Sequence, residues 1–249
     1  MRTLRGEDTL GRRKETAPPP PRCMGVEVET SLSHPSLIPF IEHRGVEVVY
    51  DVGANVGQFG RALRLFGYKG LIVSFEPASS NYALLEKVAA ADGNWDCFHC
   101  ALGSKSGKAQ INGSQDSQSS SLGMLSGRAE SNESNWIDQS QETVDLYTLD
   151  WIVGTMRLFV HYPAIIEIGV RGFEREVLKG ARRTLTKTAG VLMKSPTGEG
   201  SRTFSEAMQY LEGLGFSPCQ IGPTDPDQTD RMAVMAVDCL FQPKSAAIH

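Results

Sequence analysis

Two apolar segments that each end in an acidic residue constrain the fold of this chain more than any other feature of its sequence. The first ends in Asp51 and continues into the turn 53–57, which reads Gly-Ala-Asn-Val-Gly. A helical pattern of apolar residues follows the turn. The second segment, residues 71–76, ends in Glu76. A strand, a glycine turn, a helix and a second strand that ends in a carboxylate predict the nucleoside-binding half of a doubly wound α/β sheet.

The turn between these segments favours S-adenosylmethionine over a dinucleotide. A dinucleotide site needs Gly-x-Gly-x-x-Gly, which binds a pyrophosphate at a helix N-terminus, and the turn lacks it. No Lys-Ser or Lys-Thr follows, which excludes a P-loop. Asp51 would repel a pyrophosphate but suits a ligand with an ammonium group, and Glu76 can accept hydrogen bonds from both ribose hydroxyls. S-adenosylmethionine carries both groups. The alternative is a strand–turn–helix unit whose glycines serve packing alone.

Six short blocks in a fixed order resemble the FkbM-type methyltransferases. They are residues 51–57, 75–77, 101–103, 119–122, 148–150 and 172–181. The resemblance covers roughly residues 46–195. It implies an enzyme that depends on S-adenosylmethionine, in a family that often O-methylates sugars or natural products. It also implies a doubly wound, seven-stranded, mostly parallel sheet of the class I methyltransferase type, with a terminal antiparallel strand and a β or loop insertion over the active site.

The cofactor residues follow from the motifs and from the general position of ligands in such sheets, outside the carboxyl ends of the strands. The loop around Ala101 and Leu102 reaches the same edge and is a candidate for packing the adenine. The predicted cofactor-binding residues are Asp51, Gly53, Asn55, Gly57, Glu76, Ala101 and Leu102.

The end of the fourth predicted parallel strand departs from the family pattern. The family usually has Lys-Ile-Asp-Val-Glu/Gln-Gly there, and this chain has Glu-Ile-Gly-Val-Arg-Gly at residues 167–172. Glu167 replaces the usual lysine and Gly169 the usual aspartate, while Lys194 stands where the family has an acid at the end of the fifth strand. Glu167 and Lys194 then form either a reversed ion pair that moves the chemistry or a purely structural pair.

The predicted reaction is O-methylation of a hydroxyl on a sugar or another small polar metabolite. A hydroxyl acceptor loses its proton during transfer, so a general base is useful. Glu167 and Glu174 are the candidates for positioning the acceptor or removing its proton, although Glu174 could equally cap its helix. Two alternatives stay open: a catalytically impaired protein that binds the cofactor or a partner only, and a nucleotide-dependent oxidoreductase, against which the missing fingerprint argues.

The order of patterns predicts one domain with two tails. Residues 1–30 form a basic, proline-rich tail that we expect to be disordered, with an incorrectly assigned start codon as the alternative. Residues 31–243 form the methyltransferase domain, in which 104–142 is a lid or insertion or else a disordered loop. Residues 244–249 are a second tail. The domain should contain helices at 36–44, 56–66, 81–91, 149–153, 173–184 and 203–214, and strands at 46–51, 71–75, 94–100, 108–111, 144–147, 164–168, 191–194, 216–221 and 232–241.

Composition limits the partners. A net charge of −4 argues against a broad nucleic-acid surface, and no run approaches the roughly 20 apolar residues of a membrane span. Five cysteines, an odd number, in a chain whose first 22 residues lack a secretory apolar core fit reduced thiols in the cytoplasm. Cys97 and Cys100 are more typical of buried strand thiols than of half a zinc site, and no metal-binding residue is assigned, which leaves a metal requirement open. His99 and His161 are weak candidates for a base, and the serines 119–121, Trp136 and Trp151 are weak candidates for ligand contacts.

Overall fold

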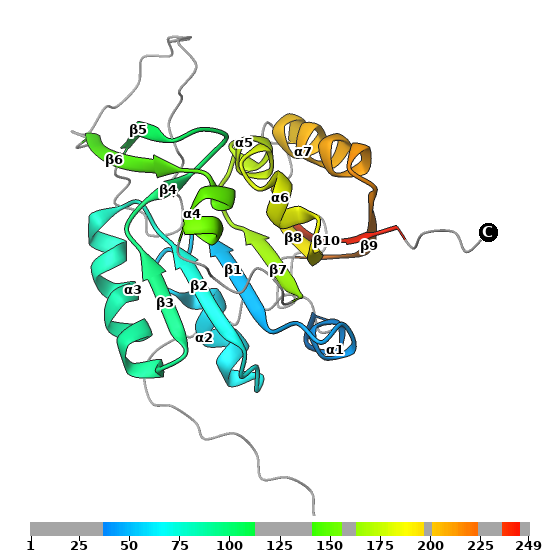
Figure 1. The fold of residues 1–249 in the computed structure, drawn as a ribbon, viewed down its shortest axis with the longest axis horizontal. Coiled ribbons are helices and arrows are strands. Elements are labelled where there is room, and N and C mark those ends of the chain that lie inside the picture. Colours follow the sequence, from blue (N-terminus) through cyan, green and yellow to red (C-terminus); the bar gives the residue numbers. More distant parts are fainter. Residues whose placement is uncertain (1–36, 113–140, 156–162, 197–200, 224–235, 245–249) are drawn as a thin grey trace, which may run out of the picture.

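The computed structural model describes residues 37–112, 141–155, 163–196, 201–223 and 236–244 (Figure 1). Several sequence predictions lie outside these ranges and stay predictions. They concern the tail 1–30, the serines 119–121, Trp136, His161 and most of the tail 244–249.

The core of the domain is a seven-stranded sheet with the order β3-β2-β1-β7-β8-β10-β9. Strands β1, β2, β3, β7 and β8 pair in parallel, and β10 is antiparallel to both of its neighbours, which confirms the predicted fold class. The strand order reverses beside β1, where doubly wound sheets bind their ligands. The bounds are Val48–Val52 (β1), Leu71–Phe75 (β2), Trp95–Phe98 (β3), Ala164–Ile168 (β7), Thr188–Pro196 (β8), Phe216–Pro223 (β9) and Ala236–Pro243 (β10).

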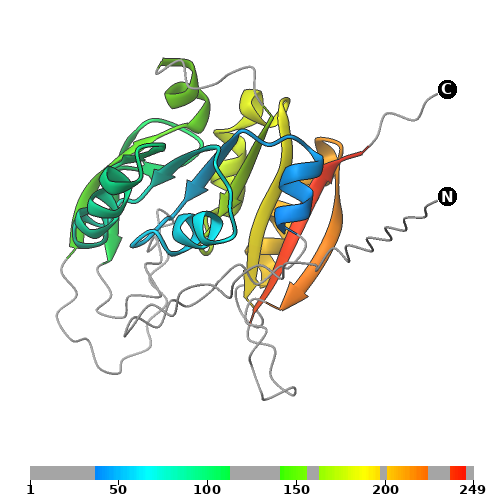
Figure 2. The ribbon, with the colours of Figure 1, turned by 90° about the horizontal axis from the view of Figure 1, so that it is seen from below.

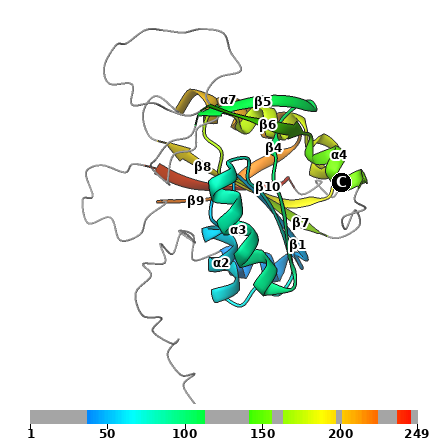
Figure 3. The ribbon, with the colours of Figure 1, turned by 90° about the vertical axis from the view of Figure 1, so that its left-hand side faces the viewer.

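Helices cover both faces of this sheet (Figure 3). On one face lie α1 (Leu37–His43), α2 (Gln58–Leu65) and α3 (Ser79–Asp92), and on the other lie α4 (Leu149–Thr155), α5 (Glu174–Lys179), α6 (Arg182–Leu185) and α7 (Ser201–Gly213). Helix α1 packs across β8 and β10 (Figure 2), where a Cβ added at Gly190 would lie only 2.9 Å from the Phe40 ring. No helix in the described ranges is long and apolar enough to cross a membrane.

The predicted single helix 173–184 is wrong in one respect, because the structure divides it into α5 and α6 around Gly180. A Cβ on Gly180 would lie 2.0 Å from the carbonyl oxygen of Gly103, so only glycine allows this close backbone approach. Asp150 then caps the start of α6. Its carboxylate accepts hydrogen bonds from the N–H groups of Arg183 and Thr184, both at 2.8 Å. The family blocks 148–150 and 172–181 therefore meet in a packing contact.

Helix α2 begins at Gln58 rather than at the predicted Val56, because Asn55 and Gly57 both have positive φ, at 53° and 82°. The helix lies against Trp95 of β3. A Cβ on Gly60 would lie 2.3 Å from that indole, so the glycine lets the helix approach the sheet. Cys97 lies in β3 and Cys100 just after it, and both thiols are free.

The predicted insertion 104–142 begins and ends as β structure. Strands β4 (Ala101–Leu102), β5 (Gly107–Asn112) and β6 (Gln141–Tyr147) form a second sheet in the order β4-β6-β5. Its apolar face packs on Ala78, which follows Glu76 at the end of β2. In Figure 1 this small sheet lies above the carboxyl ends of β1 and β2. Residues 113–140 lie outside the described ranges, so the predicted lid is untested.

Candidate functional site

The turn after β1 holds two glycines and an asparagine in the left-handed region. Gly53 and Gly57 have φ of 82°, and Asn55 has φ of 53°, a conformation that asparagine tolerates better than most residues. A Cβ at Gly53 would lie 2.8 Å from Val170 Cγ1. The turn therefore lies directly against the end of β7, and this close approach needs glycine at position 53.

The N–H groups of this turn already have acceptors inside the protein. Gly53 and Ala54 donate to the carbonyl of Phe75 at 2.9 and 3.1 Å. Asn55 donates to Glu76 Oε2 at 2.8 Å. A phosphate-binding loop works because its N–H groups point at the ligand with no other partner. These three donors are occupied, so the turn offers little to a pyrophosphate and argues against a dinucleotide cofactor.

Glu76 joins the turn to the end of β2. Its Oε1 accepts a hydrogen bond from the N–H of Ala78 at 2.9 Å, while Oε2 accepts from Asn55. Burial raises the pKa of this carboxyl, and the two backbone hydrogen bonds oppose the shift. Each carboxylate oxygen can accept more than one hydrogen bond. Glu76 is thus held in one orientation and keeps acceptor capacity for a hydroxyl.

Ala101 and Leu102 lie in β4, in the small sheet that packs on Ala78, two residues after Glu76. Both residues are buried in β4, and Ala101 packs in the same small apolar cluster as Ala78. The N–H of Gly103 donates to the carbonyl of Tyr147 at 2.9 Å and fixes the loop to β6. All seven predicted cofactor residues therefore lie at the carboxyl edge of β1 and β2 or in the sheet that packs on it.

Asp51 is buried at the end of β1, with 1% of its surface exposed. Its Oδ2 accepts a hydrogen bond from Ser74 Oγ at 3.0 Å, and Ser74 Oγ accepts one from Trp95 Nε1 at 3.0 Å. Because an indole N–H only donates, the hydroxyl hydrogen of Ser74 must point at Asp51. Burial raises the pKa of Asp51 to about 6. Three adjacent strands thus hold this carboxylate in place.

Glu167 lies directly beside Asp51, since the two residues are register partners in β1 and β7. It is 2% exposed. A Cβ added at Gly169 would lie 3.5 Å from Glu167 Oε1 and 3.3 Å from the carbonyl oxygen of Gly53. The Glu167 carboxyl therefore lies under Gly169, close to the turn 53–57. Burial raises the pKa of Glu167 well above its usual range.

Lys194 is electrostatically coupled to this pair from β8, the strand next to β7. Its positive charge lowers the pKa of both Glu167 and Asp51 and opposes the effect of burial. Asp238 is the register partner of Lys194 on β10 and is 1% exposed. The charge of Lys194 thus acts on Glu167 within a cluster of three acids and a lysine, and the reversed ion pair stays a prediction.

Glu174 points into the protein. It is 0% exposed, its Oε1 accepts a hydrogen bond from the N–H of Gly172 at 3.0 Å, and a further hydrogen bond joins its side chain to Thr203 on α7. Of the two roles predicted for Glu174, this geometry favours holding the loop before α5. A contact with the acceptor stays a prediction.

Two aromatic candidates from the sequence have partners of their own. His99 Nε2 lies 3.0 Å from the carbonyl oxygen of Pro77, and its ring stacks on Tyr82 with centroids 4.7 Å apart. Trp151 is 47% exposed and stacks on Tyr147 with centroids 4.9 Å apart. A hydrogen-bonded histidine at the sheet edge is the role that the sequence favours for His99.

Ser74, Trp95 and Asp238 belong to the site but were not predicted. Ser74 interrupts the apolar strand Leu-Ile-Val-Ser-Phe, and Asp238 interrupts another apolar strand. The sequence contains one signal for these residues, namely a polar residue within an otherwise apolar strand. A polar side chain that is buried in a sheet needs a hydrogen-bonding or charged partner, so it indicates a buried interaction. The sequence alone does not show which strands are neighbours, so the partners remained hidden.

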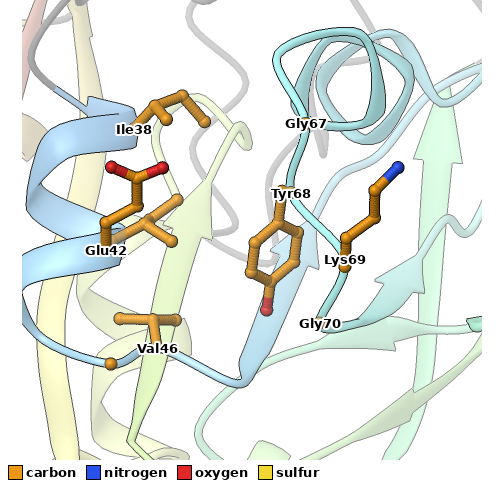
Figure 4. A pocket seen from close by; sticks show the side chains of 9 residues that line it. Ile38, Glu42, Val46, Gly67, Tyr68, Lys69 and Gly70 are labelled. Carbon is orange, nitrogen blue, oxygen red and sulfur yellow. The ribbon is translucent and has the colours of Figure 1, made fainter.

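A hollow of about 250 Å³ lies at the opposite, amino edge of the sheet (Figure 4). Its walls come from α1 and from the turn between α2 and β2, with the side chains of Ile38, Glu42 and Tyr68 around it. The hollow is remote from Asp51 and Glu76, which end their strands at the other edge. It therefore belongs to a different part of the molecule from the candidate site.

Comparison with protein families identifies the chain. The description "Methyltransferase FkbM domain" matches residues 51–218, well over half of the sequence. The chain belongs to this family. The matched range includes the Asp51 turn, Glu76, β7 and Lys194, so the site described above is the candidate active site of an FkbM methyltransferase domain. A comparison with curated protein sequences gives no match.

Solved structures with a similar fold are distant in sequence. The FkbM methyltransferase of Methylobacillus flagellatus shares 17% identity, with 79% of this chain covered, 43% of that chain and a TM-score of 0.49. Fibrillarin from Aeropyrum pernix, solved with S-adenosylmethionine, shares 12% identity. The match covers 86% of this chain and 76% of the fibrillarin chain, with a TM-score of 0.47. This chain thus spans less than half of the Methylobacillus protein. The FkbM assignment rests on the family match.

Proposed function

We propose that this FkbM domain binds S-adenosylmethionine and transfers its methyl group to a hydroxyl of a sugar or another small polar metabolite in the cytoplasm. The observation that carries the proposal is the turn 53–57, whose occupied N–H groups disfavour phosphate while two buried carboxylates flank it. Acids at this position suit a nucleoside that carries hydroxyls and a positive charge.

Each part of the cofactor has a matching group at this edge. Glu76 would accept the ribose hydroxyls, and the glycines of the turn allow the ligand to approach the backbone. Ala101 and Leu102 are each 2% exposed and would support the adenine site from β4. Asp51 is too buried to contact the ligand widely, so its negative charge would attract the ammonium group over a short, poorly screened distance.

The cofactor supplies an electrophilic methyl group on its sulfonium. The contribution of the protein is to hold the acceptor oxygen close and in line with that group, which can account for much of the rate acceleration. Gly169 and the exposed Arg171 follow the end of β7, next to the turn, and would border the acceptor. Glu167 and Glu174 are the predicted residues for acceptor positioning or proton removal. Their burial favours an indirect role.

The proposal is tested by a methyl-transfer assay on the purified protein. Formation of S-adenosylhomocysteine is measured with a panel of sugars and polar metabolites, and each hydroxyl compound is matched by its deoxy analogue and by the corresponding amine. We expect turnover with at least one hydroxyl compound and none with its deoxy analogue. Turnover with the amines alone would contradict O-methylation.

The departures at Glu167 and Gly169 favour one alternative, a domain that binds the cofactor but does not transfer methyl groups. A Cβ at Gly169 lies 3.5 Å from Glu167 Oε1, so an aspartate there would meet a second carboxyl. The two positions must therefore be changed together. If the chain is impaired, Glu167→Lys with Gly169→Asp should raise turnover, whereas an active wild-type enzyme should lose activity in the double variant.

A further inference from the structure

Asp51 and Glu167 are register partners on β1 and β7, both are buried, and the pKa shifts of both carboxyls reflect a hydrogen bond between them. Two ionised carboxylates cannot make such a bond, since both only accept. Asp51 Oδ1 is buried and receives no hydrogen bond from an N–H or hydroxyl group of the described residues, while Oδ2 accepts from Ser74. A proton on one of the two carboxyls provides the missing donor. The pair therefore holds a proton between β1 and β7.

The surrounding groups decide which residue carries this proton. Ser74 donates to Asp51 and stabilises its ionised form. For Glu167 the negative charges of Asp51 and Asp238 both disfavour ionisation. Lys194 favours the ionised form of either acid. The hydrogen bond from Ser74 favours the charge on Asp51, and burial raises the pKa of Glu167 well above its usual range, so the proton belongs on Glu167.

We propose that Glu167 is a positioning residue that stays a neutral carboxylic acid and donates a hydrogen bond to Asp51, so that the pair carries one negative charge, located on Asp51 beside the cofactor turn. That the negative charge of Asp51 attracts the ammonium group of the cofactor rests on the proposed function. The protonation of Glu167 does not, because it follows from register, burial and the orphaned oxygen of Asp51.

The pair is set among charges from every neighbouring strand. Glu76, at the end of β2, interacts unfavourably with an ionised Asp51. Lys194 on β8 compensates for one acid, and Asp238 on β10 adds another negative charge. Two ionised acids in the pair would leave the buried cluster with an excess of negative charge. A single shared proton reduces this excess while keeping one charge near the ligand.

This arrangement changes the role open to Glu167 in methyl transfer. A carboxyl that holds a proton at neutral pH cannot accept another one from a hydroxyl. Glu167 therefore affects the cofactor through Asp51, and removal of its titratable proton need not abolish turnover. Glutamine is the matched replacement, because its side-chain amide has the same shape and can donate the same hydrogen bond without titrating.

The direct test is infrared spectroscopy of the cofactor-free protein at neutral pH. A protonated carboxylic acid has a carbonyl stretch well separated from the carboxylate bands. We expect this band in the wild type, its loss in Glu167→Gln, and its retention in the matched surface variant Glu212→Gln. An unchanged band in Glu167→Gln, or no such band in the wild type, would overturn the proposal. Carbon-13 spectra of wild-type glutamate Cδ signals give the same answer if the variant does not fold.

Cofactor binding gives a second readout that separates positioning from catalysis. We expect Glu167→Gln to bind S-adenosylmethionine within about threefold of the wild type, and Glu167→Met, which leaves Asp51 Oδ1 without a donor, to bind about tenfold more weakly. Equal binding by both variants with loss of turnover in both would show Glu167 to be a catalytic base and contradict positioning. If the wild type binds no cofactor, the proposed function fails while the infrared result stands.

Discussion

The two halves of the carboxyl edge are built in different ways. Around β1 and β2 the site is formed mainly by backbone groups. The N–H groups of the turn 53–57 donate hydrogen bonds to the carbonyl of Phe75 and to the carboxylate of Glu76. Around β7, β8 and β10 the site consists of charged side chains on three strands, namely the buried Glu167 and Asp238 and the half-buried Lys194. A backbone-built half depends on local geometry, whereas a half built of charges depends on protonation. The two halves should therefore respond to different perturbations.

The largest expected effect is on the backbone-built half. Gly53→Ala combines a strained φ of 82° with a Cβ 2.8 Å from Val170. We expect the affinity for the cofactor to fall about 100-fold and the free energy of unfolding to fall by about 2 kcal/mol or more. The matched control is Gly45→Ala, which has φ of 59° and no atom within 4 Å. It carries strain without a clash. Titration calorimetry and thermal unfolding give both quantities, and equal effects in the two variants would contradict the close-contact explanation.

The next largest effect is expected when the negative charge of Asp51, which lies where the two halves meet, is removed. Asp51→Asn keeps the shape of the side chain but removes its negative charge, and we expect S-adenosylmethionine to bind about 10- to 100-fold more weakly. Calorimetry measures the change, with Asp238→Asn as control, because Asp238 lies two strands beyond Glu167 in the sheet order. Binding that is weakened equally by Asp238→Asn would indicate that net charge, rather than the location of the charge, governs affinity.

The charge-built half predicts a specific pH dependence of stability. The folded-state pKa of Asp51 is about 6, above the value of roughly 3.9 in unfolded chains, so the folded protein binds more protons between these limits. The contribution of Asp51 to stability is therefore fully present below about pH 4 and is lost as the pH rises through 6. We expect a decline of about 2 to 3 kcal/mol in the wild type that is absent in Asp51→Asn. Urea unfolding at several pH values measures both, and parallel curves would refute the shift.

A smaller effect is expected from the hydroxyl that supports Asp51. Ser74→Ala removes the donor to Oδ2, so the ionised carboxylate loses one charge-assisted hydrogen bond and cofactor affinity falls about fivefold. Thr188→Val is the control, since its buried hydroxyl donates to the carbonyl of Thr184 at the amino edge. Both variants should lower the melting temperature, but only Ser74→Ala should lower affinity. A loss of affinity in both would point to a general loosening of the sheet.

The backbone-built half could be predicted from the sequence because its parts are close together in the chain. The glycine turn and the acid at the end of the next strand form a local pattern, and Asp51 and Glu76 lie where it placed them. The charge-built half could not, because it depends on the register of β1 with β7 and on the insertion of β10 beside β8. Glu167 was chosen from its departure from the family pattern, but its partner Asp51 became evident only from the strand pairing.

The helix boundaries show the same limit. Gly180 reads as a tolerated residue inside a helix, and only its contact with Gly103 shows why α5 ends there. Asp150 belongs to one of the blocks that resemble the family, and only the structure shows that it caps α6 from a distance along the chain. Tertiary contacts determined both features, and periodicity does not record them.

The central claim is that the carboxyl edge of β1 and β2 binds S-adenosylmethionine rather than a dinucleotide. Titration calorimetry of the wild-type protein with S-adenosylmethionine, S-adenosylhomocysteine and NAD tests it most directly. We predict saturable binding of the first two, tighter for the ligand with the additional sulfonium charge at neutral pH, and no heat of binding with NAD. Binding of NAD, or a folded protein that binds neither adenosyl ligand, would contradict the account.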